Sequence, residues 1–182
     1  MVKEALDELL NSDLVTIKTK QVLKERENEN AISPKFFTAD EFELLQSVCD
    51  FLMAQTENRL VDIAGKIDER LVAKSGPGWR YNQLPPDGTA YKTGLKGITE
   101  SMLLLSHKSF ADLSAQHKNN LLKTVQQGKA EGEIWINFSG KLFFELMLAE
   151  ATEHFYSNPL VQAEINYTGF ADAKGWDVPQ LK

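Results

Sequence analysis

Thiols are scarce in this sequence of 182 residues, in which Cys49 is the single cysteine. An internal disulfide is therefore excluded. Cys49 lies among apolar residues on one face of a predicted helix. Because free cysteine is one of the most buried residue types, we interpret Cys49 as a core residue with no reactive role.

Long apolar runs are also lacking, and none is long enough to span a lipid bilayer. The first residues, Met1 to Glu8, carry acidic side chains. They contain neither the basic segment nor the apolar segment of an export signal. As it stands, the sequence therefore predicts a protein that stays in the cytoplasm.

Positive charge is in short supply as well, because 20 Lys and Arg residues stand against 26 Asp and Glu residues, for a net charge of -6. The acidic residues are spread along the whole chain, and no basic stripe is present to neutralise phosphate groups. Nucleic acid is therefore not an expected partner. The length suits one ordinary domain with a sizeable core.

Alternating apolar and polar residues, which would predict a strand, are missing too, and apolar residues recur instead at helical spacing. We therefore predict an all-α fold, a single helical-bundle-like domain with a long central C-terminal helix and an irregular aromatic tail. Residues 1–30 are predicted to form a charged N-terminal helical arm. Residues 31–182 are predicted to form the helical domain.

The clearest local signal is a capping box, in which the Thr38 side chain caps a helix and Glu41 reaches back to the cap. This helix is predicted to end near Gln55. A second helix, with Leu60, Ile63, Ile67 and Leu71 on its apolar face, is predicted to end at Gly76. An irregular connection is then expected from residue 75 to residue 94. Further helices are predicted from Leu95 to Leu105, Ser114 to Gln127 and Ile134 to Tyr156.

Motifs for chemistry are few, and the sequence predicts no catalytic, cofactor-binding or metal-binding residue. The segment Gly76-Pro77-Gly78 follows a helix, whereas a dinucleotide fingerprint must follow a strand. One alternative stays open. Glu150, Glu153 and His154 come together near the end of the last helix, and this set could hold a metal ion in a small stand-alone metal-binding enzyme.

Aromatic residues without helical periodicity are concentrated in one connection and in the C-terminal tail. Tyr and Trp side chains provide large, rigid contact areas and are enriched at protein interfaces. A second alternative is a helical protein that self-associates through the tail. The predicted partner-binding residues are Trp79, Tyr81, Tyr167, Phe170 and Trp176.

Motifs near the two ends of the chain form an ordered pattern. They are Phe36-Phe37-Thr38 with Glu41, Ile67-Asp68, Phe143-Phe144, Phe155-Tyr156, Pro159, Tyr167, Gly169 and Gly175-Trp176. From about Phe36 to Trp176, this pattern resembles the gluconate 2-dehydrogenase subunit 3 family. The specificity of the resemblance lies in the order and spacing of the two ends, because the middle helices are generic.

The resemblance implies a small helical subunit that holds no cofactor and is not an enzyme by itself. Its implied partner is a larger FAD-dependent dehydrogenase of the glucose-methanol-choline type, often accompanied by a cytochrome c subunit. That partner would oxidise a sugar or a sugar acid such as gluconate. Members of this bacterial family commonly carry a twin-arginine leader, which this sequence lacks. A periplasmic location is therefore expected only if the protein is exported with a partner.

Overall fold

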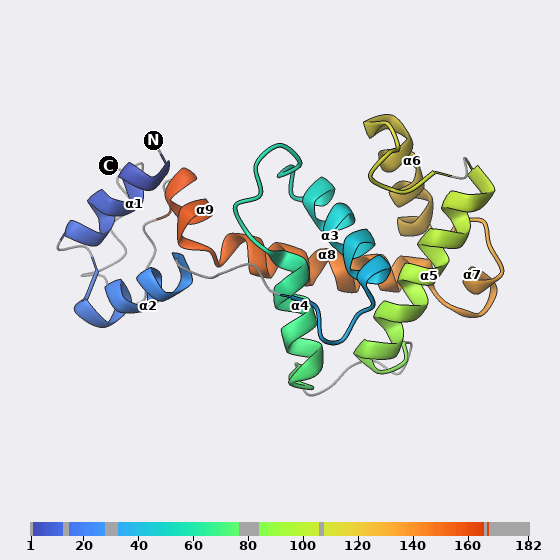
Figure 1. Ribbon diagram of the computed structural model, residues 1–182, viewed down its shortest axis with the longest axis horizontal. Helices are drawn as coiled ribbons and strands as arrows, with labels where there is room; N and C mark the ends of the chain where they lie inside the picture. Colours follow the sequence, from blue (N-terminus) through green and yellow to red (C-terminus); the bar gives the residue numbers. More distant parts are fainter. Residues whose placement is uncertain are drawn as a thin grey trace. The chain divides into compact units, whose positions relative to one another are not determined.

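The computed structural model describes residues 2–12, 15–27, 33–76, 84–105, 108–165 and 167. Regular structure in these ranges is helical and includes no strand, which confirms the all-α class. None of the helices in these ranges is both long and apolar enough to cross a membrane. The helices, labelled in Figure 1, are α1 (Val2–Asn11), α2 (Ile17–Glu27), α3 (Ala39–Leu52), α4 (Ile63–Val72), α5 (Asp87–Leu105), α6 (Ala115–Gln126), α7 (Ile134–Asn137), α8 (Gly140–Tyr156) and α9 (Pro159–Glu164).

The chain divides into two compact units, one formed by residues 1–31 with 153–182 and the other by residues 32–152. In the first unit, α1 and α2 both contact α9. Leu6, Leu10 and Leu23 are buried there with Ala163, and Leu160 packs against them. The first and last parts of the chain therefore build one small core. The family domain at 31–182 stays a prediction.

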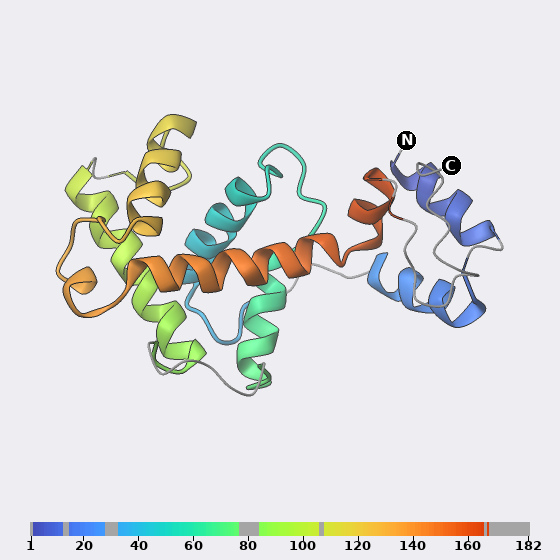
Figure 2. The same ribbon diagram turned by 180° about the vertical axis from the view of Figure 1, so that it is seen from behind.

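In the second unit, α3 contacts α4 and α5, and α5 in turn contacts α6 and α7. Helix α8 runs across α3, α4 and α5, behind them in Figure 1 and in front of them in Figure 2. Cys49 is fully buried, as predicted, and burial raises the pKa of its thiol. Other fully buried side chains of this core are Leu45, Val48, Ile67, Leu95, Ile98, Phe143 and Met147.

The predicted capping box at the start of α3 is confirmed. The Glu41 amide donates to Thr38 Oγ1 at 3.3 Å, and the Thr38 amide donates to Glu41 Oε2 at 2.9 Å. The helix ends at Leu52, before the predicted Gln55. The cause lies at Ala54, whose φ of 53° is incompatible with a right-handed helix.

Helix α4 also ends earlier than predicted, at Val72 in place of a stop at Gly76. The chain leaves the helix at Lys74, which has a φ of 52°. A left-handed residue after the last turn is the usual helix stop, and glycine is its commonest but not its only occupant. Gly76 therefore does not mark the end of this helix.

The expected irregular connection up to residue 94 is wrong in its second half, because α5 already begins at Asp87. The Ala90 amide donates to the Pro86 carbonyl at 2.9 Å and so starts the helical hydrogen bonds. Proline is well tolerated before the first helical turn, where amides lack partners anyway. Gly88 and Gly94 suggested a loop, but they are helical residues that permit close packing.

Replacing Gly94 with alanine is expected to lower the free energy of unfolding by about 2 kcal/mol. An added Cβ would overlap the ring of Phe143, which is fully buried and cannot move into solvent. The higher helix propensity of alanine offsets only part of this loss. Urea denaturation of the purified protein measures the effect. In a Phe143→Leu background the same substitution should cost less, and an equal cost in both backgrounds would contradict the packing explanation.

The predicted helix from Ile134 to Tyr156 is broken into α7 and α8. Phe138 is extended, with φ -135° and ψ 123°, and Ser139 Oγ accepts the Leu142 amide at 3.3 Å. Serine favours such capping positions over helix interiors. For this helix the apolar pattern predicts one face with Leu142, Leu146 and Ala149, broadened by Phe143, Phe144 and Met147. The last three are buried in α8, whereas Leu142 and Leu146 are half-buried and Ala149 is exposed.

Beyond α8 the tail was predicted to be irregular, but it contains the short helix α9. The Asn158 side chain accepts the Leu160 amide at 2.9 Å, and Pro159 occupies the first helical position. Both residue types favour a helix start. The part of the predicted aromatic tail after Tyr167 lies outside the described residues.

Candidate functional site

Of the five predicted partner-binding residues, the structure describes Tyr167 alone. Trp79, Tyr81, Phe170 and Trp176 lie outside the described residues. Tyr167 follows α9, where its amide donates to the Gln162 carbonyl at 2.8 Å, and 42% of its surface is exposed. A partner-binding role for these five residues stays a prediction.

The metal-binding alternative depends on Glu150, which the structure places in a different setting. Tyr91 donates its hydroxyl proton to Glu150 Oε2 at 2.6 Å, and Arg70 Nη2 donates to the same oxygen at 2.9 Å. Arg70 Nε donates to Glu150 Oε1. Among the described residues, no group of three or more His, Cys, Asp and Glu side chains could hold a metal ion. Glu153 is exposed, and the predicted trio is not such a group.

Arg70 connects three helices of the second unit. Besides Glu150 on α8, it binds Asp87 at the start of α5, with Nη1 and Oδ2 separated by 2.8 Å. Partial burial lowers the pKa of Arg70, but the hydrogen bonds and charge of Glu150 outweigh this and raise it. Burial and the Glu150 charge raise the pKa of Tyr91. The network therefore holds Arg70 charged and Tyr91 protonated, which suits a structural role.

A second buried carboxylate, Asp68 on α4, binds the segment that leads into α3. Its Oδ2 accepts the Lys35 amide at 2.8 Å, and its Oδ1 accepts the Phe36 and Phe37 amides at 3.0 Å each. The side chain is fully buried. Three charge-assisted hydrogen bonds stabilise a carboxylate in such a position. Asp68 therefore fixes the chain just before the capping box.

The connection between α3 and α4 is held by a third polar group. Asp50 pairs with Arg59, whose Nε lies 2.9 Å from Oδ2. Gln55 donates to Asp50 Oδ1 at 3.0 Å and accepts the Leu60 and Val61 amides at 3.2 Å. Like Glu150 and Asp68, these buried groups are engaged with the chain's own backbone and side chains.

A groove runs along the surface between α3 and α5. Its first part, about 520 Å³ in volume, lies between the first turns of α3 and the first half of α5. Its second part, about 330 Å³, continues past the middle of both helices to the segment before α6. Asp40, Leu44 and Thr99 line both parts, so the two form one continuous groove.

The floor of the second part of this groove is largely apolar. Leu44 from α3 and Met102 and Leu103 from α5 line it together with Phe110. Leu103 is 50% exposed, and the next two residues, Leu104 and Leu105, are 62% and 65% exposed. The end of α5 therefore leaves several apolar side chains uncovered, and apolar groups left exposed together often mark interaction sites.

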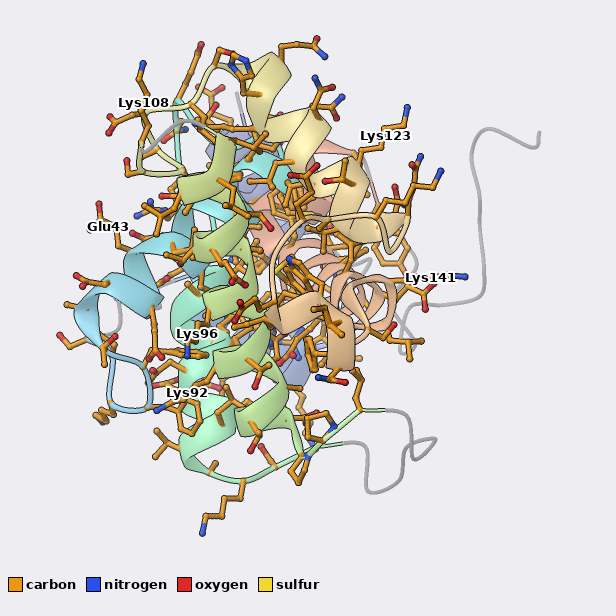
Figure 3. The ribbon with its side chains drawn as sticks, turned by 90° about the vertical axis from the view of Figure 1, so that its right-hand side faces the viewer. Glu43, Lys92, Lys96, Lys108, Lys123 and Lys141 are labelled. Carbon is orange, nitrogen blue, oxygen red and sulfur yellow. The ribbon has the colours of Figure 1, made fainter. Side chains whose placement is uncertain are left out.

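The two edges of the groove carry opposite charges. Asp40 and Glu43 lie along the α3 edge, and Lys92 and Lys96 lie along the α5 edge, with Lys108 beyond the end of α5. Figure 3 labels Glu43 at the outer side of α3, Lys92 and Lys96 next to one another lower along α5, and Lys108 at the upper end. Lys92 lies 4.7 Å from the centre of the Phe36 ring.

The sequence predicted neither the groove nor the structural roles of the buried carboxylates Asp68 and Glu150. The sequence does contain a signal for the role of Asp68. This residue follows Ile67, at the border of the apolar face of a helix, where burying an unpaired charge would be costly. For the groove, Lys92, Lys96 and Leu103 fall on one face of α5 at helical spacing. That signal was lost because the first part of α5 was predicted to be irregular.

Comparison with known proteins gives one result. The family model for gluconate 2-dehydrogenase subunit 3 matches residues 39–173, well over half of the chain. The matched range contains all helices from α3 to α9 and therefore the whole α3 edge and α5 edge of the groove. No curated protein matches the chain, and no solved structure matches it.

Proposed function

The chain belongs to the gluconate 2-dehydrogenase subunit 3 family, and from this membership we propose that it is a non-catalytic accessory subunit of a dehydrogenase complex. Its role is to bind a larger flavin-dependent dehydrogenase of the glucose-methanol-choline type and to stabilise or mature it. The large subunit carries FAD and oxidises a sugar or a sugar acid such as gluconate. A cytochrome c subunit is a further candidate member of the complex.

The use of the buried polar groups supports an accessory role. Within the described residues, the buried polar side chains are Asp50, Gln55, Asp68, Ser101, Glu150 and Asn158. Each of them makes hydrogen bonds inside the chain, to backbone amides, a backbone carbonyl or a neighbouring side chain. These groups stabilise the fold, whereas the groove and the exposed leucines offer surface for another protein.

The location of the protein follows from this role. An accessory subunit works where its large subunit works, so we propose that the two share one compartment. That compartment is the cytoplasm if neither chain is exported and the periplasm if the pair is exported together. Fractionation of native cells, with both chains followed by mass spectrometry, tests this point.

Affinity capture of the tagged protein from its native cells is expected to recover a large flavoprotein in a near-equimolar amount. The eluate should show the absorbance bands of oxidised flavin, and these bands should bleach when the correct sugar or sugar acid is added. Capture with the tag alone is the control. Reciprocal capture through the large protein should return this chain.

A colourless eluate that contains this chain alone, at full yield, would contradict the proposal. Metal analysis of that eluate would then test the enzyme alternative based on Glu150, Glu153 and His154. Sedimentation at two concentrations would test self-association. The three outcomes therefore separate the accessory subunit from both alternatives.

A further inference from the structure

We propose that the groove between α3 and α5 binds an amphipathic helix of the flavoprotein large subunit. This helix places apolar residues on the groove floor, basic residues against the α3 edge and acidic residues against the α5 edge. The inference rests on the proposed function, since it names the surface through which the accessory subunit holds its partner.

The shape of the groove suits one helix. Both parts of the groove are lined by successive turns of α3 and α5, which run in the same direction along it. From Lys92 to Leu103, α5 advances by eleven residues, or about 16 Å at 1.5 Å per residue. A helical segment of about three turns spans this length. Helices in apolar grooves are a recurring mode of peptide recognition, with contacts repeated every three or four residues.

The floor supplies the apolar contact that such a helix needs. Leu44 is half-buried and Leu103 is half-exposed, so both keep free surface that a partner side chain can cover. Leu104 and Leu105 are also exposed, although neither lines the groove. Burial of apolar area is the main source of binding free energy, while the surrounding polar groups fix the geometry.

The charged edges specify what kind of helix fits. Within the described part of the chain, the side chains of Asp40, Glu43, Lys96 and Lys108 form no ion pair or hydrogen bond. Unpaired acidic side chains on the α3 edge and unpaired basic side chains on the α5 edge therefore flank the apolar floor. A helix with basic residues along one side and acidic residues along the other meets both rows with attraction. A helix with one sign on both sides is repelled at one edge.

A second copy of this chain fits the groove less well. Each copy carries a net charge of -6, so two copies repel each other at long range. A groove is concave, and two identical concave surfaces do not fill each other. A partner segment with mixed charge has neither disadvantage, which favours the flavoprotein as the occupant.

Site-specific photocrosslinking in the captured complex tests the position of the interface. A benzophenone amino acid replaces Thr99, an exposed residue that lines both parts of the groove, and in a matched control it replaces Lys123, which lies on α6 away from the groove. Thr99 is expected to crosslink to the flavoprotein. The crosslinked peptide should have an apolar stripe between a basic side and an acidic side.

Charge reversal tests the contribution of the α5 edge. The double variant Lys96→Glu/Lys108→Glu is expected to weaken the complex about tenfold. The control Lys123→Glu/Lys141→Glu changes the net charge equally at exposed positions outside the groove, labelled in Figure 3, and should match the wild type. Wild-type and variant chains, one of them isotope-labelled, compete for limiting flavoprotein, and their ratio in the captured complex gives the relative affinity. Circular dichroism confirms that both variants are folded.

Each outcome bears on the proposal. A flavoprotein that co-purifies normally but crosslinks from position 123 and not from position 99, or that binds both double variants equally, overturns the groove and leaves the accessory function standing. A crosslink from position 99 to a second copy or to this chain's own tail also overturns it. If no flavoprotein co-purifies, the accessory function fails and the groove proposal fails with it.

Discussion

Replacing Glu150 with alanine is expected to lower the free energy of unfolding by about 3–5 kcal/mol. The substitution leaves Arg70 with a largely buried charge that has lost the carboxylate binding Nε and Nη2. It also removes the acceptor of the fully buried Tyr91 hydroxyl. The remaining carboxylate near Arg70, Asp87, binds only Nη1 and cannot replace these contacts. Chemical denaturation, with the midpoint and slope both fitted, measures the loss.

Two further variants separate a buried ion network from a general effect of mutating α8. Glu153→Ala, an exposed change on the same helix, should alter stability by less than about 0.5 kcal/mol. The double variant Glu150→Leu/Arg70→Met removes both charges and should lose less than Glu150→Ala alone. A double variant that loses the sum of two large single effects would show that the charges do not act as a pair.

Asp68→Ala is expected to produce the second large loss, about 3 kcal/mol. The fully buried carboxylate accepts three consecutive backbone amides, from Lys35 to Phe37, and alanine offers none of them an acceptor. Hydrogen bonds to a charged acceptor are stronger than neutral ones, which is why three of them make a large difference. Thermal unfolding followed by circular dichroism at neutral pH measures the effect.

Asp68→Asn is the matched control for this prediction. Its carbonyl oxygen can still accept the Phe36 and Phe37 amides, while its NH₂ group faces the Lys35 amide without a favourable contact. The loss should therefore lie between those of the wild type and Asp68→Ala. If asparagine and alanine destabilise equally, the negative charge matters more than the number of acceptors.

Local signals predicted much of the fold. Three local predictions are confirmed because each depends on residues close together in sequence. They are the Thr38 and Glu41 capping box, the buried stripe around Cys49 and the helix from Ser114 to Gln127. The predicted helix bounds were wrong where a glycine or a serine serves packing or capping in the folded protein. Gly94 favours irregular structure by its residue type, but it lies in a helix against Phe143. Ser139 was placed inside a helix that it in fact begins.

The groove and the buried charge network could not be predicted in the same way. The residues at their sites come from helices far apart in sequence, such as Arg70 and Glu150, which are 80 positions apart. Helical periodicity identifies an apolar face, but it does not reveal which helix covers that face. Glu150 was therefore grouped with its sequence neighbours Glu153 and His154, although its partners lie on α4 and α5.

The two units differ in when the ribosome can complete them. Residues 32–152 form a continuous stretch, so every part of this unit leaves the ribosome before residues 153–182 do, and its folding does not have to wait for them. The other unit joins the first 31 residues to those after 152. Leu6, Leu10 and Leu23 must therefore wait, without their Ala163 partner, until the chain has been synthesised past α9. Helices α1 and α2 are made before the second unit, but their core can form only after it.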